Sequence, residues 1–94
     1  MALTLKFIGA LRHASGAETL ALNCKKSVSL MDLVNELTKE VPTLRRSLLD
    51  EQLEPPKPNA LILVNGREIS VLSGLETKVK DGDEIVFIPV VHGG

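Results

Sequence analysis

The 94-residue sequence is poor in aromatic residues, with two phenylalanines and neither tyrosine nor tryptophan. This scarcity argues against a protein that stacks single-stranded nucleic acid on aromatic side chains. Lysine and arginine number 11, aspartate and glutamate number 12, and the formal net charge is −1. No basic cluster interrupts this balance, so we expect no nucleic-acid partner, because phosphate binding needs a basic patch.

Cysteine occurs once, as Cys24, which excludes an internal disulfide or a cysteine metal cluster. His13 and His92 lie far apart and have no carboxylate or thiol at ligand spacing, so we predict no metal site. The sequence also lacks a run of 18 apolar residues and an N-terminal signal-peptide pattern. We therefore expect no membrane partner and a cytoplasmic location.

Aliphatic residues supply most of the 44% hydrophobic content, enough for the core of one small domain. Alternating apolar residues predict a first strand over residues 2–8, and a second strand follows near residues 19–23. Strands this close form an antiparallel pair, with residues 11–17 expected as the loop between them. The core-facing residues of the first strand are Leu3, Leu5 and Phe7.

A helix is predicted to begin at Ser29, which resembles the first residue of a capping box with Asp32 in the third position. Pro42 ends this helix at Val41, because a residue before proline avoids helical geometry. The apolar stripe that faces the core consists of Leu30, Leu33, Val34, Leu37 and Val41.

The segment after this helix is less regular. We expect Thr43 to cap a second short helix that runs through Leu49. The following residues, 50–59, form a polar loop with three prolines, which predicts a stiff and extended conformation.

The second half of the chain contains three further strand signals. Residues 60–64 form a compact apolar strand, and Asn65-Gly66 is the favoured two-residue hairpin turn. Residues 68–71 are the predicted return strand. Asp81-Gly82 makes another turn before the last strand, residues 84–89.

This order predicts an α+β fold with a mixed sheet of four to five strands and one main helix packed on one face. The helix lies in the crossover between the second and third long strands. The last strand is apolar on both sides, so we place it at the sheet centre beside the first strand.

Alternation along the last strand separates a core face from an outer face. Ile85 and Phe87 are assigned to the core, together with Ile62 and Val64. The residues that then face outward, away from the helix, are Leu63, Val86 and Ile88. We interpret these three as a partner-binding patch; the alternative is that the strands are simply hydrophobic and are partly covered by the long loop.

The sequence finishes with Gly93-Gly94, directly after this apolar strand. No side chain shields the carboxylate of Gly94, and glycine adopts backbone angles closed to other residues. We divide the chain into a domain at 1–89 and a flexible tail at 90–94, which extends at most about 17 Å from Pro89. The tail either presents its carboxylate to a partner or is a frayed end. His92 is either a spacer or a contact to an acidic or phosphate group.

Two segments carry a family resemblance: residues 64–68 (VNGRE) and residues 80–94 (KDGDEIVFIPVVHGG). They resemble the ubiquitin-like β-grasp family, and within it the sulfur-carrier branch. That branch includes the small subunit of molybdopterin synthase, the thiamin sulfur carrier, the ubiquitin-related modifier and the small archaeal modifier proteins. The resemblance implies a β-grasp fold.

The resemblance also implies a chemistry in which this chain is the carried substrate and not an enzyme. An E1-like adenylating enzyme would use ATP and magnesium to activate the carboxylate of Gly94, and this chain would bind no cofactor itself. A persulfide would then give a terminal thiocarboxylate for molybdopterin synthesis or tRNA thiolation. Implied partners are a sulfurtransferase or the large subunit of molybdopterin synthase, in whose complex the chain would be the small subunit.

Two alternatives remain beside the sulfur carrier. In the first, the chain is a protein modifier joined through Gly94 to lysines of target proteins. In the second, it is a β-grasp module that binds partners without covalent chemistry. The sequence leaves open the final sulfur acceptor, the oligomeric state, the role of residues 50–59 and the identity of any conjugated lysine.

Overall fold

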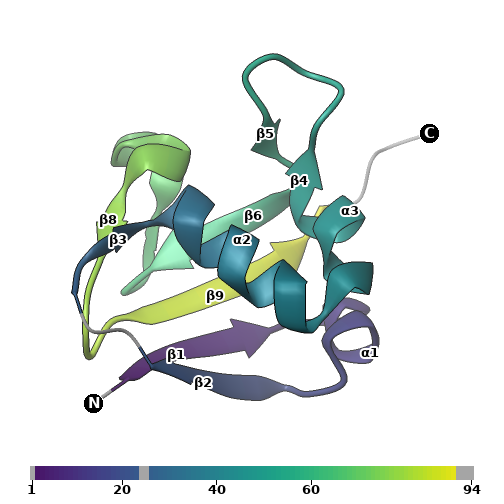
Figure 1. Cartoon of the computed structure of the whole chain (residues 1–94), viewed down its shortest axis with the longest axis horizontal. Helices are drawn as coiled ribbons and strands as arrows, with labels where there is room; N and C mark the ends of the chain where they lie inside the picture. The colour runs from purple at the N-terminus through teal and green to yellow at the C-terminus, as the bar shows by residue number, and fades with distance from the viewer. Residues whose placement is uncertain (1, 24–25, 91–94) are drawn as a thin grey trace.

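The computed structural model describes residues 2–23 and 26–90 and forms a five-stranded mixed sheet with one main helix on one face (Figure 1). This helix is α2 (Leu30–Glu40), and along the chain it lies between the second and third strands of the five-stranded sheet. The strand order is β2-β1-β9-β6-β7. These strands are β1 (Ala2–Phe7), β2 (Thr19–Asn23), β6 (Ala60–Val64), β7 (Arg67–Glu68) and β9 (Glu84–Pro89). The predicted α+β class is confirmed.

The last strand, β9, lies in the middle of the sheet, as its apolar character on both faces predicts. It pairs parallel to β1, with Phe7 opposite Phe87, and antiparallel to β6, with Ile62 opposite Phe87. The first and second strands form the expected antiparallel pair, with Leu5 opposite Leu20. The central strand therefore joins the two ends of the chain into one sheet.

Helix α2 begins where the capping pattern predicts. The Ser29 hydroxyl accepts a hydrogen bond from the backbone N–H of Asp32 at 3.1 Å, which satisfies one of the free donors at the helix start. The helix ends at Glu40, before Val41 and Pro42. Its core face is buried at Leu30, Leu33, Val34, Leu37 and Thr38, and Val41 is partly buried.

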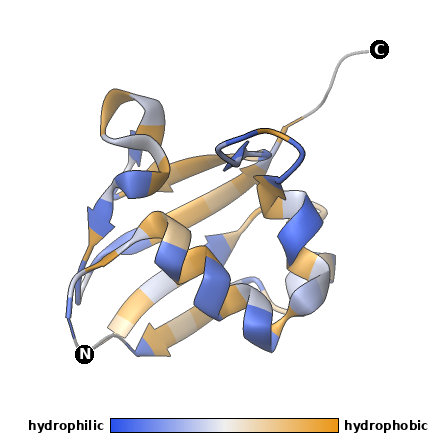
Figure 2. Cartoon of the chain, turned by 45° about the horizontal axis from the view of Figure 1, so that its top comes forward, coloured by the Kyte–Doolittle hydropathy of each residue, from blue (hydrophilic) through white to orange (hydrophobic). Residues whose placement is uncertain are grey.

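The core lies between α2 and the sheet, and its centre is a pair of aromatic rings. Phe7 and Phe87 stack with their ring centroids 5.3 Å apart, and both are fully buried. Ile62, Val64 and Ile85 are buried beside them, as predicted. Figure 2 shows hydrophobic residues along the central strands and hydrophilic segments on the outer side of the helix.

A second, smaller strand pair closes the other end of the core. β3 (Val28–Ser29) pairs antiparallel with β8 (Lys78–Val79), and the side chain of Val79 is fully buried. The backbone N–H of Leu30 also donates to the carbonyl of Thr77 at 2.9 Å. This pairing fixes the start of α2 against the chain that leads into β9.

The expectation of a loop over residues 11–17 is wrong, because α1 (Leu11–Ser15) occupies most of it. Leu11 is buried and holds this short helix against the core. Gly16 ends it with φ 79°, and its N–H donates to the carbonyl of Arg12. Five residues are too few to show a helical repeat in the sequence.

Thr43 does not cap the second helix. Residues Pro42–Leu44 form the 3₁₀ turn η1, and the helix α3 (Arg45–Leu48) follows it without a side-chain cap. The Thr43 hydroxyl instead donates to the carbonyl of Ala14, at 3.1 Å, and so ties η1 to α1.

Two further segments differ from expectation. Residues 50–59 do not run extended, because β4 (Leu49–Asp50) and β5 (Lys57–Pro58) pair antiparallel and fold the segment back on itself. The predicted return strand over 68–71 ends at Glu68, whose carboxylate accepts from the backbone N–H of Ser70. This bond opens the 3₁₀ turn η2 (Ile69–Val71), which is followed by η3 (Gly74–Glu76).

The packing predicts that α2 stability depends on Leu37. We expect Leu37→Ala to lower the free energy of unfolding by about 2–5 kcal/mol, because it leaves a cavity in the core. Urea denaturation followed by circular dichroism measures this loss. Glu40→Ala, three residues along on the exposed face, should change stability by less than about 0.5 kcal/mol. Equal losses in the two variants would contradict the assigned orientation of α2.

Candidate functional site

The first part of the candidate site is the end of β9, from which the chain continues toward Gly94. His92, Gly93 and Gly94 lie outside the described residues, and so does most of the predicted tail at 90–94. Pro89 is the last residue of β9 and lies opposite Ala60. The next residue, Val90, is 48% exposed. Proline cannot donate a ladder hydrogen bond, which suits a strand end.

Neighbouring strands hold this strand end from both sides. The backbone N–H of Ile8 donates to the carbonyl of Phe87 at 3.0 Å. Gly9 follows with φ +59°, and a Cβ at Gly9 would lie 3.3 Å from Cγ of Pro89. A side chain there would be strained and would press on the proline ring. The glycine therefore allows β1 to turn away while Pro89 packs closely against it.

The second part of the site is the sheet face opposite α2. Leu63, Val86 and Ile88 lie on this face, because they alternate with the buried residues of β6 and β9. All three are half-buried, and Leu63 lies directly opposite Val86. The predicted orientation of these side chains is confirmed, whereas their binding of a partner stays a prediction.

Two residues that sequence reasoning left out extend the same face. Leu61 is 38% exposed and lies opposite Ile88, and Ile8 is 37% exposed and follows Phe7 on the neighbouring strand. Strict alternation along residues 60–64 would have identified Leu61. We call the combined surface the outer-face patch; it consists of Ile8, Leu61, Leu63, Val86 and Ile88.

A charged pair borders the outer-face patch. The ammonium group of Lys6 lies 3.1 Å from a carboxylate oxygen of Glu84, and both side chains are substantially exposed. Such a pair contributes little to stability. Its position beside Val86, which lies opposite Lys6 in the parallel pair, gives the apolar patch a polar rim. Apolar centres with polar rims are typical of protein–protein interfaces.

The proline-rich loop, residues 50–59, is anchored on the helix side of the molecule by Arg45. Its Nε and Nη2 donate to the two carboxylate oxygens of Glu51, at 2.8 and 3.0 Å. Its Nη1 donates to Oδ1 of Asn35 and to Oγ1 of Thr38, both at 3.0 Å. One guanidinium thus connects α2, α3 and the loop.

This bidentate contact shifts the pKa values of both groups. Hydrogen bonding from Arg45 lowers the pKa of Glu51 below its usual value, and the same bond raises the pKa of Arg45. At the loop's other end, the side-chain amide of Asn59 donates to the carbonyl of Arg46 at 2.9 Å. The loop is therefore tied to the α3 region at both ends.

Glu36 and Glu40 are both exposed on α2, and Glu36 pairs with Lys39 at 3.0 Å. Within residues 2–23 and 26–90, no group of three or more His, Cys, Asp or Glu side chains could hold a metal ion. Over the same residues, no helix combines the length and hydrophobicity of a membrane span.

Comparisons with known proteins agree with this geometry. The ThiS family model matches residues 5–94. Small archaeal modifier protein 3 of Haloferax volcanii is 30% identical over 94 residues, all of both chains. A ubiquitin-related modifier 1 homolog of Drosophila willistoni is 34% identical over 102 aligned residues, again all of both chains. The solution structure of small archaeal modifier protein 1 of Methanosarcina acetivorans is 36% identical, with a TM-score of 0.78 over 99% of this chain and 96% of that one.

The mixed sheet with one helix on one face is the fold of a ubiquitin-like β-grasp protein. The match over residues 5–94 assigns it more narrowly: the chain belongs to the ThiS family, among the β-grasp sulfur carriers and modifiers. The resemblance stated from residues 64–68 and 80–94 is confirmed.

The Arg45–Glu51 contact predicts a pH-dependent contribution to stability. Glu51 has a lowered pKa in the folded state, so its contribution is present above the unfolded pKa of about 4.3 and is lost as pH falls through the folded pKa. We expect the stability difference between the native protein and Glu51→Gln to shrink on acidification from pH 7. Denaturation at a series of pH values measures it.

A direct titration provides the control. By NMR, the Glu51 carboxyl should titrate below the ordinary glutamate value, and Arg45→Lys should move it back toward that value, because lysine lacks the two-pronged donor geometry. An ordinary titration in the native protein would contradict the role of Arg45.

Proposed function

We propose that this chain is a sulfur carrier whose reacting group is the carboxylate of Gly94. The observation that carries the proposal is the family match, which extends through Gly93 and Gly94. The position of β9 supports it, because this central strand is held on both sides, ends at Pro89 and is followed by an exposed residue, Val90. The compact domain would then hold the tail in a fixed direction for a partner.

The chemistry follows from the poor reactivity of a carboxylate. An α-carboxyl group has a pKa near 3.5, so it is ionised at neutral pH and resists nucleophilic attack. In the proposal, an E1-like enzyme catalyses attack of the Gly94 carboxylate on the α-phosphate of ATP and supplies magnesium, and pyrophosphate leaves. A persulfide sulfur of a partner then displaces AMP, and cleavage of the sulfur–sulfur bond by a thiol leaves the thiocarboxylate. The ATP and magnesium sites belong to the partner.

The same proposal assigns the outer-face patch to docking. Its residues are apolar, partly exposed and bordered by the Lys6–Glu84 pair. It would seat the adenylating enzyme and, later, the sulfur acceptor, which is a sulfurtransferase or the large subunit of molybdopterin synthase. The two partners would bind the same patch in succession, so that Gly94 is first activated by the adenylating enzyme and then presented to the sulfur acceptor.

A second candidate function is covalent modification of proteins. It is favoured by the two full-length relatives, which are both named as modifiers. In this case the activated Gly94 forms an isopeptide bond with a lysine of a target protein, and AMP or a thiol leaves. A non-covalent interaction module is the alternative of a different class, and it would use the sheet without Gly94.

Removing Gly94 separates the covalent functions from the interaction module. We expect deletion of Gly94, or addition of one residue after it, to abolish adenylate formation, because the carboxylate is then one residue short of the nucleotide or one residue beyond it. ATP–pyrophosphate exchange with the activating enzyme of the same cell measures this step. The matched control is His92→Ala, which keeps the tail length and should retain exchange. Full exchange in the deletion variant would contradict the role of Gly94.

The product distinguishes carrier from modifier. Mass spectrometry of the protein isolated from its own cells should show a terminus at Gly94 with sulfur in place of oxygen if it is a carrier. Lysines of other proteins joined by an isopeptide bond to a peptide of this chain that ends in Gly94 would establish the modifier instead. A terminus other than Gly94 in the active protein would contradict both.

The outer-face patch yields a separate prediction. We expect Ile88→Asp to remain folded, because the side chain is half-buried on the outer face, and to lower kcat/KM for activation about tenfold or more, the loss of ~1.4 kcal/mol of binding. Val71→Asp is the matched control, since Val71 is an exposed apolar residue outside the patch. Unchanged activation kinetics in Ile88→Asp would exclude the patch from docking.

A further inference from the structure

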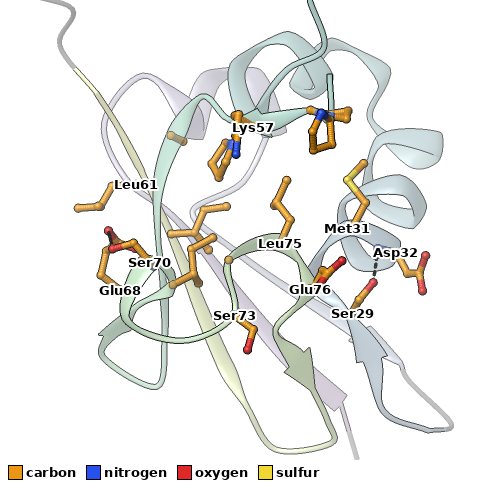
Figure 3. Close-up of a pocket in the computed structure, with 17 residues that line it drawn as sticks. Ser29, Met31, Asp32, Lys57, Leu61, Glu68, Ser70, Ser73, Leu75 and Glu76 are labelled. Carbon is orange, nitrogen blue, oxygen red and sulfur yellow. Dashed lines mark hydrogen bonds between the residues drawn. The ribbon is translucent and has the colours of Figure 1, made fainter. Parts of the chain in front are cut away.

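The two sides of the five-stranded sheet differ in how well their edges are covered. On the side of β6 and its short partner β7, the residues whose backbone groups face away from β9 include Ala60 and Ile62, which are 6% and 1% exposed. The turn η2 packs beside them. A groove of about 680 Å³ also lies here, and Met31 and Leu75 point into it from α2 and η3 (Figure 3). This edge of β6 is closed to another strand.

Strand β2 forms the opposite edge, and among the described residues no strand lies beyond it (Figure 1). The backbone N–H of Phe7 donates to the carbonyl of Glu18 at 2.9 Å. In the register of β1 with β2, the backbone groups of Leu20 and Leu22 therefore also face β1. The alternate residues direct their backbone groups outward: Thr19, Ala21 and Asn23. All three are exposed, so their N–H and C=O groups are accessible to another strand.

The sequence of β2 carries none of the features by which edge strands usually avoid pairing. Such strands are commonly protected by charged side chains, by proline or by a bulge. Thr19–Asn23 contains neither a charged residue nor a proline, and it pairs with β1 in a continuous register. The strand is therefore both uncovered and unprotected.

We propose that β2 pairs antiparallel with β2 of a second copy of this chain, so that the two sheets join into one. The register that uses all three outward residues places Ala21 opposite Ala21 of the second copy, on a two-fold axis, and Thr19 opposite Asn23. Each of these residues then exchanges backbone N–H···O=C bonds with the residue opposite it. A two-fold contact of this kind is self-complementary.

The leucines of β2 fit the same register. Leu20 and Leu22 lie opposite Leu5 and Leu3 of β1, point to the helix side and are half-buried. In the proposed pair, Leu20 of each copy lies opposite Leu22 of the other, on the same face. A groove of about 350 Å³ between β2 and α2 is lined by Leu22 and Leu33, so the facing leucine would lie at its mouth. The pairing would thus bury apolar surface that a single copy leaves partly exposed.

The charges at the two ends of β2 favour a second copy in antiparallel orientation. Glu18 precedes the strand and is exposed, and its carboxylate also lies 3.7 Å from Nη2 of Arg12. Lys26 follows the strand and is exposed as well. An antiparallel pair places the acidic start of one copy beside the basic end of the other, whereas a parallel pair would bring like charges together.

The proposed pair leaves the outer-face patch accessible, because β1 separates β2 from β9 and β6. The two-fold axis also places the ends of the two β9 strands at opposite ends of the joined sheet. The proposal therefore stands independently of the chemistry at Gly94, and each copy would keep its own patch and tail for a partner.

Sedimentation equilibrium of the full chain measures the association. We expect monomers at low concentration and dimers as the concentration rises to about 1 mM, where a micromolar dissociation constant gives mostly dimer. In ¹⁵N-labelled protein, the amide signals of Thr19, Ala21 and Asn23 should shift over the same range, with little change at Val86. A chain that stays monomeric, or shifts confined to the outer-face patch, would overturn the proposal.

Charge variants at Ala21 test the register. Ala21→Lys and Ala21→Glu each place like charges opposite each other on the two-fold axis, so each alone should dimerise about fivefold more weakly or less. Mixed in equal amounts, the two should associate at least as tightly as the native protein, because lysine then lies opposite glutamate. Circular dichroism establishes that both variants are folded, since Ala21 is exposed.

The matched control is Thr4→Lys. Thr4 lies opposite Ala21 in β1, one strand away from the proposed contact, and the change in net charge is the same as in Ala21→Lys. Its dimerisation should equal that of the native protein. Equal weakening in Thr4→Lys and Ala21→Lys, or a mixture of the two Ala21 variants that associates no more tightly than either alone, would overturn the proposal.

Discussion

The parallel pairing of β1 with β9 is the constraint on which the rest of the structure depends. It brings residues from the two ends of the chain side by side and stacks Phe7 on Phe87 at the centre of the core. The chain has no other aromatic residues, so this stack and the aliphatic residues around it provide nearly all of the core. Burial of such side chains contributes roughly 1.5–3 kcal/mol each. A sheet without β9 would separate into two hairpins, neither of which is stable alone.

This pairing also determines where the functional surfaces lie. Because β9 is central, its outward side chains meet those of β6 and the end of β1 in one patch. Because β9 runs parallel to β1, the two strands end on the same side of the molecule, and Pro89 lies beside Gly9. The direction of one strand thus places the outer-face patch and the start of the tail next to each other. A partner that docks on the patch would find the tail close by.

The groups that anchor the loop act on the other side of the molecule. Arg45 gathers Asn35, Thr38 and Glu51 around one guanidinium. This contact and the bond from Asn59 to the carbonyl of Arg46 hold the proline-rich loop on the helix side of the sheet. Contacts on the helix side therefore position the loop, and contacts with the outer-face patch are not required.

Much of the fold follows from local patterns that are strong in the sequence. Alternation predicts β1, compact apolar runs predict β6 and β9, the Ser29 cap predicts the start of α2, and the Asn65-Gly66 turn adopts the positive φ angles that its residues favour. The outward orientation of Leu63, Val86 and Ile88 follows from the same alternation.

The failures occur where a contact distant in sequence decides a short segment. Residues 11–15 show no helical repeat, and the burial of Leu11 against the core stabilises them as a helix. The Thr43 hydroxyl donates to the carbonyl of Ala14 and does not cap a helix. A local bond can also interrupt a strand, as Glu68 does by accepting from the N–H of Ser70. The groove lined by α2, β6, η3 and the proline-rich loop could not be predicted, because these elements are distant in sequence.

The central position of β9 has a consequence for the synthesis of this protein. On the ribosome, the chain can form its hairpins early, but β1 stays without its parallel neighbour until residues 84–89 have left the exit tunnel. Contacts between such distant segments also slow folding. Completion of the domain therefore requires residues 84–89, and any molecule that has reached the native state has already been translated through Pro89. A chain truncated before residue 84 lacks β9 and therefore cannot form the complete sheet.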